Sequence, residues 1–395
     1  MTISSQIQGV VVAWQIYAIT HDPLSLGLMG LAEALPFIGF ALYAGHIADR
    51  LNRHHVSLVA IGVLVACSLT LLAFNLIPGF LLAHGAWPFF GVIFLSGIAR
   101  SFLQPARNAL AAEIVERPLF ANAVAWRSST WQTAAVVGPA LGGLIYGYAS
   151  PRVAYIADAV MMTAALITFS SIRYAGRDPS RHGESVSDSL RQGLRFVFRE
   201  PVLWSALTLD LFSVLLGGAE ALLPVFADQI LHVGPQGLGI LRAAPAGGAV
   251  IASVYLAHRR PFKRAGATML IAVAIFALSV IGFGLSRSVL LSIFLLAISG
   301  MADNVSVLIR STLLQVLTPD HLLGRVSSVN SIFVGSSNEL GAFESGVAAR
   351  LVGTVTSVVL GGLASLGVVA FIGVKVPRLR RLGKIDDLNP TQIAA

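Results

Sequence analysis

The sequence predicts an all-α integral membrane protein with twelve transmembrane helices in two pseudo-symmetric six-helix halves around a central cavity. Three observations lead to this fold class: the composition, the placement of basic residues and an internal repeat. Of the 395 residues, 55% are hydrophobic and only 12% are charged, and the mean hydropathy is +0.78. A soluble domain of this size cannot bury that much apolar surface, so we expect lipid to solvate it.

Apolar stretches long enough to cross a membrane recur along the chain. A spanning helix needs about 20 mostly apolar residues, because each backbone polar group must be satisfied within its own segment. Twelve stretches meet this condition, at residues 3–19, 26–47, 57–76, 87–107, 128–148, 153–172, 203–231, 236–257, 266–285, 288–309, 328–349 and 352–373. The first is short and polar and begins almost at Met1, so we expect the natural chain to extend further at this end. It lacks the basic region of a secretory signal.

A long connection separates the first six stretches from the last six. We therefore expect an N-terminal half at 1–172, a cytoplasmic amphipathic linker at 173–202, a C-terminal half at 203–374 and a cytoplasmic tail at 375–395. The linker contains SDSLRQGLRFVFRE, which at helical spacing has an apolar and a basic face. These faces hold Leu190, Leu194 and Val197 or Phe198, and Arg191, Arg195 and Arg199. The pattern predicts a helix lying on the inner leaflet.

An internal repeat relates the two halves. A shift of 203 residues holds in one ungapped register across two predicted helices and their loop. It matches Ser96, Gly97, Ala99, Arg107, Leu110, Gly138 and Gly143 to Ser299, Gly300, Ala302, Arg310, Leu313, Gly341 and Gly346. Each half holds an even number of spans, so duplicated copies share one orientation about an axis along the membrane normal, with a cavity between them.

Basic residues gather on one predicted side of the membrane. Most of the 27 Lys and Arg residues fall in the connections that follow even-numbered spans (2–3, 4–5, 6–7, 8–9 and 10–11) and in the C-terminal tail, and Arg310 is assigned to the connection after the tenth span. Basic loops stay cytoplasmic, so we expect both termini inside. The net charge of +8 is therefore a topology signal. Because these cations are spread over short loops, binding to nucleic acid is not expected.

The connection after the second span carries the motif GHIADRLNRHH, residues 45–55. Its form GxxxDRxxR, at Gly45, Asp49, Arg50 and Arg53, resembles a signature of the major facilitator superfamily. Asn52 stands where that family usually has glycine, and asparagine tolerates a left-handed backbone. The resemblance implies a cytoplasmic latch, with the Asp at a helix N-terminus and the arginines on acidic partners. A solvated charge cluster is the alternative.

The fifth span contains GPALGG, residues 138–143, which resembles a signature of exporters in the same superfamily. Pro139 removes a backbone hydrogen bond and bends the helix, while Gly138, Gly142 and Gly143 allow another backbone to come close. Helix packing alone would also explain such glycines. A wider resemblance, to the prokaryotic branch that includes enterobactin and macrolide exporters, rests on WQIYAIT (14–20), ARNALAAEIV (106–115) and SSNELGAFESG (336–346).

The energy source is inferred from what the chain can bind. It has no GxxxxGK[ST] phosphate loop, so transport would be secondary, and we expect proton-coupled antiport by alternating access. Ion coupling needs ionisable groups at membrane depth, where they are costly and therefore functional. The proton-coupling candidates are Glu339, Glu220, Asp210, Asp303, Glu344 and Glu33, and the buried cations are Arg100 and Arg242.

Depth along the spans sorts these groups. Arg100, Asp210 and Asp303 fall toward the cytoplasmic third, where an ion pair or triad is expected. A second set, formed by Arg242, Glu33 and Glu344, falls toward the outer third and could form a gate there. Finally, Glu220 and Glu339 lie near the middle with no cation at their depth, so either could exchange a proton near neutral pH. A carboxyl that stays permanently protonated is the alternative.

The expected substrate cavity mixes aromatic and amide side chains with few charges. Its candidates are Trp14, Tyr17, Trp131, Gln132, Phe212, Asn338 and Phe343. Such a lining suits small amphipathic compounds, drug-like or siderophore-like. An importer, a lipid flippase or an integral-membrane enzyme remains an alternative, but all nine histidines map to loops or span ends, which disfavours an enzyme. We expect a monomer in the prokaryotic inner membrane, without metal or cofactor.

Overall fold

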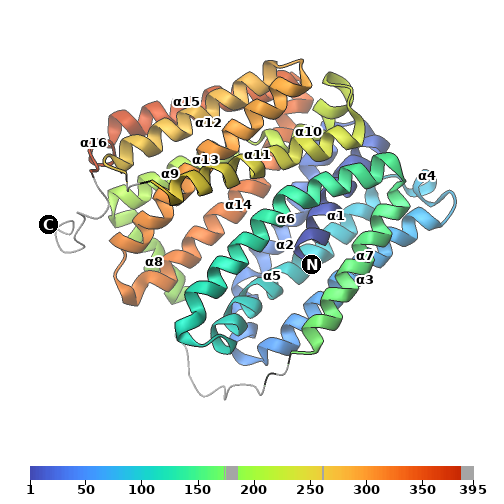
Figure 1. Cartoon of the computed structure of the whole chain (residues 1–395), viewed down its shortest axis with the longest axis horizontal. Helices are drawn as coiled ribbons and strands as arrows, with labels where there is room; N and C mark the ends of the chain where they lie inside the picture. Colours follow the sequence, from blue (N-terminus) through green and yellow to red (C-terminus); the bar gives the residue numbers. More distant parts are fainter. Residues whose placement is uncertain (173, 175–185, 260–261, 384–395) are drawn as a thin grey trace. The chain divides into compact units, whose positions relative to one another are not determined.

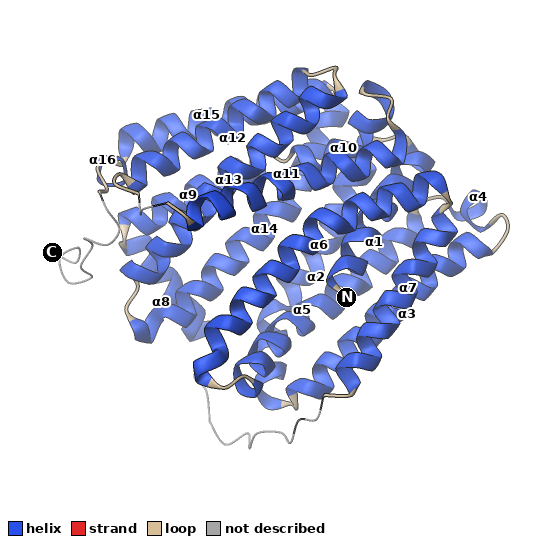
Figure 2. Ribbon diagram, viewed as in Figure 1, coloured by secondary structure: helices blue, strands red, loops and turns tan. Residues whose placement is uncertain are grey.

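The structure is a computed structural model that describes residues 1–172, 174, 186–259 and 262–383. Over these residues the secondary structure is helical and includes no β-strand (Figure 2). The all-helical fold class is therefore confirmed.

The first six predicted spans fall on helices (Figure 1). They are α1 (Thr2–Thr20), α2 (Pro23–Arg50), α3 (Arg53–Leu76), α5 (Trp87–Ile114), α6 (Phe120–Tyr148) and α7 (Pro151–Ser170), with the short α4 (Phe80–His84) and a 3-10 turn (Arg117–Leu119) between them. Local sequence sets several starts, because Pro occupies the first turn and a short polar residue precedes it. Asp22 Oδ1 accepts the Leu24 N–H at 3.0 Å, and Ser150 caps α7 in the same manner.

The remaining chain is also helical. It forms α8 (Val186–Arg199), α9 (Pro201–Leu216), a 3-10 turn (Ala219–Leu222), α10 (Leu223–Val225), a π-helical turn (Phe226–Ile230), α11 (Gly234–Ala257), α12 (Ala265–Leu285), α13 (Val289–Leu317), α14 (Asp320–Val352), α15 (Thr354–Lys375) and α16 (Pro377–Arg380).

Nine of the helical stretches in the described part are long and apolar enough to cross a membrane. The other three predicted spans fall on α1, α6 and α14, which are long helices of more polar sequence. A multi-pass membrane protein follows from these nine stretches. The count of twelve stays a prediction.

The chain divides into two compact units. Unit 1 holds Met1–Val186 and Leu223–Ala243, and unit 2 holds Ser187–Leu222 and Ala244–Ala395. In unit 1, α1 packs on α6 and α7, and α5 packs on α2 and α3; in unit 2, α12 packs on α13 and α15 (Figure 1). The chain passes between the units within the seventh and eighth predicted spans as well as before α8. The four predicted regions, cut at the linker, stay a prediction.

The linker helix forms as predicted, but its apolar face is covered by protein. In α8, Val197 is 1% exposed and belongs to the core of unit 2. Gly193 lies against the backbone of Arg325, to which a Cβ would come within 2.8 Å, and Gln192 hydrogen-bonds the Arg325 guanidinium. Phe198, by contrast, is exposed. The apolar face therefore packs in part on unit 2, and its position on the inner leaflet stays a prediction.

The seventh predicted span is broken where a continuous helix was expected. Its first part, α9, ends at Leu216, and two glycines precede a 3-10 turn. A Cβ at Gly217 would lie 2.5 Å from the Ser213 carbonyl oxygen, and one at Gly218 would lie 3.1 Å from Ser345 Oγ. A side chain at Gly217 would clash with this backbone oxygen, which explains the glycine there. The next span, α11, contains Pro245.

Candidate functional site

The predicted latch lies at the turn between α2 and α3. Asn52 caps α3, and its Oδ1 accepts the backbone N–H of His54 at 3.0 Å. Its φ is −61°, so the left-handed backbone expected there is wrong, and capping explains the asparagine. Gly45, Asp49 and Arg50 lie on the last turns of α2, but their side chains fall outside the described part, and the role of the Asp stays a prediction.

Arg53 supplies the acidic contact that the latch motif implies. Its guanidinium pairs with Glu113 Oε1 of α5 at 2.5 Å, and the Tyr174 hydroxyl donates to the other oxygen of the same carboxylate. One glutamate thus ties the start of α3 to the C-terminal end of α5 and to the chain after α7. Sequence reasoning did not single out Glu113, although it lies in the exporter-like stretch ARNALAAEIV.

Arg100 forms an ion pair that differs from the expected one. Its partner is Glu33 of α2, within unit 1, and not Asp210 or Asp303. Gly97, one turn earlier on α5, would place a Cβ 2.6 Å from Pro36 Cγ, so the two helices are in close contact here. This contact brings the two charges together. The same finding removes Glu33 from the expected outer gate, and the pairing of Arg242 with Glu344 stays a prediction.

A second ion pair lies in unit 2, and this one is buried. Arg310 of α13 pairs with Asp210 of α9, and the two residues are 4% and 6% exposed. Arg310 is therefore not the loop cation that was expected after the tenth span. The helix α13 continues to Leu317, which carries the arginine into the protein interior. Both ion pairs neutralise a carboxylate that the sequence offered as a coupling candidate.

Asp158 of α7 is a fully buried carboxyl that sequence reasoning missed. Ser4 Oγ lies 2.5 Å from its Oδ1, and Gln8 Nε2 donates to its Oδ2 at 3.1 Å. The same amide nitrogen donates to Ser68 Oγ of α3 at 3.3 Å. A single Asp inside the apolar stretch AYIADAVMM was the available signal.

The other carboxyl candidates occupy varied surroundings. Glu339 and Glu344 lie on α14 and are half-buried, as is Asp303 on α13. Glu220 lies in the 3-10 turn after α9, is exposed and acts electrostatically on Asp303. Glu339 also has an interaction within the structure, so the expectation of an isolated carboxyl does not hold there.

The GPALGG motif forms the tightest contacts of α6. A Cβ at Gly138 would lie 2.4 Å from Gln6 Cβ, and one at Gly142 would lie 3.1 Å from the backbone of Ile7. On another face, a Cβ at Gly143 would lie 2.4 Å from the Pro235 carbonyl oxygen. The glycines thus let α1 and the start of α11, all in unit 1, approach α6 at backbone distance.

The predicted cavity residues divide by exposure. Trp14 and Tyr17 are buried, Gln132 and Phe343 are half-buried, and Trp131, Phe212 and Asn338 are exposed. Two of them carry buried polar atoms that lack a hydrogen-bond partner among the described residues. These atoms are the Tyr17 hydroxyl and Gln132 Oε1, on α1 and α6 of unit 1. An orphaned buried polar atom is a place where a ligand atom gains a hydrogen bond.

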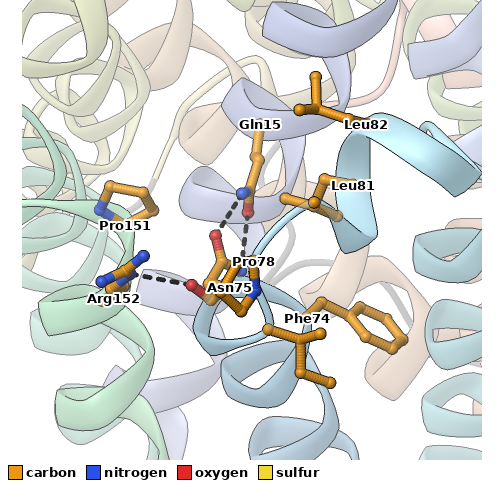
Figure 3. A pocket seen from close by; sticks show the side chains of 10 residues that line it. Gln15, Phe74, Asn75, Pro78, Leu81, Leu82, Pro151 and Arg152 are labelled. Atoms are coloured by element: carbon orange, nitrogen blue, oxygen red, sulfur yellow. Dashed lines mark hydrogen bonds between the residues drawn. The ribbon is translucent and has the colours of Figure 1, made fainter.

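A pocket of about 330 Å³ lies in unit 1 where α3 ends and α7 begins (Figure 3). Gln15 Nε2 donates to Asn75 Oδ1 at 2.6 Å, and Arg152 Nε donates to the Asn75 carbonyl oxygen at 2.9 Å. The Tyr155 hydroxyl donates to Gln15 Oε1 at 2.8 Å. These hydrogen bonds connect α1, α3 and α7 beside the pocket.

Comparison with known proteins assigns nearly the whole chain to one family. The family described as transmembrane secretion effector, of the major facilitator superfamily, matches residues 2–393. The chain belongs to this family. It is therefore a multi-pass membrane transporter of a small-molecule substrate, and not an enzyme.

Relatives and solved structures agree with this assignment. The chain is similar to the enterobactin exporters EntS of Escherichia coli O1:K1 / APEC and of Shigella boydii serotype 18, each 27% identical over 401 residues, which cover 100% of this chain and 92% of theirs. In fold it is similar to the peptide transporter POT in complex with sulfate, with a TM-score of 0.74, 14% identity and coverage of 97% and 94%. It is also similar in fold to the inward open xylose transporter XylE from E. coli, with a TM-score of 0.67, 11% identity and coverage of 95% of each chain.

Proposed function

We propose that this transporter exports small amphipathic compounds, drug-like or siderophore-like, by proton-coupled antiport and alternating access. The observation that carries the proposal is the likeness over its whole length to exporters named for enterobactin. The GPALGG motif supports the direction of transport, because it resembles a signature of exporters. In unit 1 the glycines of this motif pack α6 on α1 and on the start of α11.

Two features support the substrate class. The Tyr17 hydroxyl and Gln132 Oε1 are buried polar atoms without a protein partner in the described part, so they can bind a polar group of a ligand. Trp131 and Phe212 are exposed rings that can stack on apolar or cationic groups. Few charges accompany them, which suits a neutral or cationic amphipathic compound.

Coupling is assigned to Glu339. Counted from the start of the predicted span at 328, it lies about 16 Å from the cytoplasmic end, near the bilayer midplane. It is half-buried on α14. In the ionised form Glu339 attracts a cationic substrate, and in the protonated form its desolvation cost falls. Competition between proton and substrate is what antiport requires.

The expected setting follows the charge distribution. We place both termini in the cytoplasm and the transporter in a bacterial inner membrane as a monomer, since most basic residues fall on one side of the predicted topology. Fusions of a topology reporter to the C-terminus test this placement. An external C-terminus would contradict it.

Transport into inside-out vesicles tests the function. Vesicles with an acidic interior should accumulate a compound drawn from a panel of antibiotics, dyes and siderophores, and a protonophore should abolish the accumulation. Glu339→Gln should retain binding, measured by thermal shift of the purified protein, but lose dependence on the gradient. Glu116→Gln, an exposed carboxyl on the loop after α5, is the matched control.

Each alternative gives a different result in the same vesicles. Loss of compound from the vesicles would indicate an importer, and movement of a fluorescent lipid alone would indicate a flippase. Uphill transport by Glu339→Gln with an unchanged pH profile would move the coupling role to Glu220 or Asp303.

A further inference from the structure

We propose that Asp158 is a proton-binding site in unit 1, separate from the Glu339 site, in which one proton is held between α1, α3 and α7. The carboxyl is 0% exposed, and its polar contacts come from Ser4 and Gln8 of α1. Ser68 of α3 completes the cluster through Gln8. Binding of the proton is independent of the proposed function, whereas its use in transport rests on that function.

The site lies inside the membrane-spanning part of the helices. Asp158 is seven residues from the start of α7, and Ser68 is eight residues from the end of α3. At 1.5 Å per residue these positions are about 10 to 12 Å from one end of each helix and about 18 to 22 Å from the other. Both helices are long and apolar enough to span. An ionisable group at that depth is costly to keep and is therefore functional by default.

Asp158 differs in its partners from the two carboxyl candidates that form ion pairs. Glu33 and Asp210 each contact an arginine, so protonation of either would break an ion pair. Around Asp158, the described contacts come from neutral hydroxyl and amide groups. Protonation therefore removes a buried charge without breaking an ion pair.

More distant titratable groups also face the site. Arg100 of α5 and the Met1 amine act on Asp158 electrostatically, without a described hydrogen bond. Cys67 of α3 and Tyr155 of α7 are its buried titratable neighbours, and their ordinary pKa values of about 8.5 and about 10 lie above neutrality. The carboxyl of Asp158 is thus the one acidic group of this cluster with an ordinary titration range below neutrality.

The geometry around Ser4 fits both protonation states. A serine hydroxyl has one hydrogen, yet Ser4 Oγ lies 2.5 Å from Asp158 Oδ1 and 3.2 Å from the Asp158 carbonyl oxygen. When the carboxyl is ionised, the hydroxyl donates to Oδ1. When it is protonated, the carboxyl O–H donates to Ser4 Oγ, and the serine hydrogen turns to the carbonyl oxygen. Gln8 donates to Oδ2 in either state, so the same atoms stay in contact whether or not the proton is bound.

A change of charge at Asp158 acts directly on α1. Ser4 and Gln8 lie on either side of Gln6 and Ile7, and these two residues pack against Gly138 and Gly142 of the exporter motif. The bonds from α1 to the carboxyl are charge-assisted in the ionised state and weaker in the neutral state. Protonation therefore weakens the hydrogen bonds between α1 and α7. Because α1 also packs on α6, this change acts on the helix that contacts the exporter motif.

Infrared spectroscopy of the full chain in liposomes tests the binding of the proton. The wild type should show a protonated-carboxyl C=O band that fades as pH rises. Asp158→Asn should lose this band, and the exposed control Glu116→Gln should keep it. Identical spectra of wild type and Asp158→Asn over the whole pH range would overturn the proposal.

A second variant covers the case in which Asp158→Asn does not fold. Ser4→Ala keeps the carboxyl but removes the hydroxyl that its proton contacts, so the band should shift in frequency. An unmoved band in Ser4→Ala overturns the two-state geometry.

Transport separates this inference from the proposed function. If gradient-driven export by the wild type occurs and Asp158→Asn leaves its pH profile unchanged, the coupling role of Asp158 is wrong and the exporter assignment stands. If the wild type does not export with the gradient, the proposed function fails, and the infrared band alone decides whether Asp158 binds a proton.

Discussion

Replacing Gly143 by alanine should weaken unit 1 through a clash that side-chain motion cannot relieve. The new Cβ would lie 2.4 Å from the Pro235 carbonyl oxygen and 2.7 Å from Gly239 Cα, whereas ordinary contact begins at 3.4 Å. Both atoms belong to backbone, so α6 and the start of α11 must separate by about 1 Å, at a cost of about 1–3 kcal/mol. For a body of about 150–250 residues that is a fall of about 2–12 °C in the unfolding midpoint.

The protein carries its own reporter for this measurement. Cys67 is the single cysteine of the sequence, lies in unit 1 and is 2% exposed. A dye that fluoresces on reacting with thiols will therefore report unfolding when the purified protein is heated in detergent.

Gly62→Ala is the matched control for this clash. Gly62 lies on α3 in the same unit, and a Cβ added there would have no heavy atom within 4 Å outside its own helix backbone and chain neighbours. Alanine favours a helix over glycine by about 1 kcal/mol, so the control should melt at or above the wild-type midpoint. A Gly143→Ala protein as stable as Gly62→Ala would refute the packing argument.

Three further predictions concern charged groups. Asp210→Asn leaves Arg310 buried without its carboxylate and should destabilise unit 2 by about 3–5 kcal/mol, while Asp210→Leu combined with Arg310→Met should be nearly neutral; denaturant titration of the two variants compares them. Arg53→Ala and Glu113→Ala should each destabilise unit 1, and the double variant should lose less unfolding free energy than the sum of the two single losses. A double-mutant cycle with no coupling would contradict the contact between Arg53 and Glu113. Burial raises the pKa of Glu200, which lies between α8 and α9, so its stabilising effect is complete below the unfolded pKa and is lost as pH rises through the folded value. Glu200→Gln should flatten that part of the midpoint-against-pH curve, and superimposable curves would show that burial of this carboxyl has no effect.

Composition and span length predicted the helices well, because lipid demands long apolar segments whatever their partners. The sequence also located the latch motif and the glycines of α6. It placed Arg310 in a loop, since an arginine at the edge of an apolar stretch usually marks the end of a span. Only the buried carboxylate of Asp210, distant in sequence, allows α13 to continue past it.

Pairing of charges was the least predictable part of the candidate site. The depth of a residue along its span does not say which helix lies beside it. Arg100 pairs with Glu33 because α2 and α5 are in close contact at Gly97. Asn52 shows a similar limit, as a residue that tolerates a left-handed turn can equally cap a helix. The surroundings of Asp158 come from three helices, and a single sequence does not show which of their residues lie side by side.

The path of the chain between the units has a mechanical consequence. Besides the crossing before α8, the chain passes between units at residues 222 and 223 and again at 243 and 244. The first of these lies in the 3-10 turn after the glycine pair, and the second lies beside Pro245, where a helix loses a backbone hydrogen bond. Each crossing thus coincides with a weak point in a helix. Torque applied to one unit would be taken up as bending at these two joints, and the hairpin 223–243 would follow unit 1.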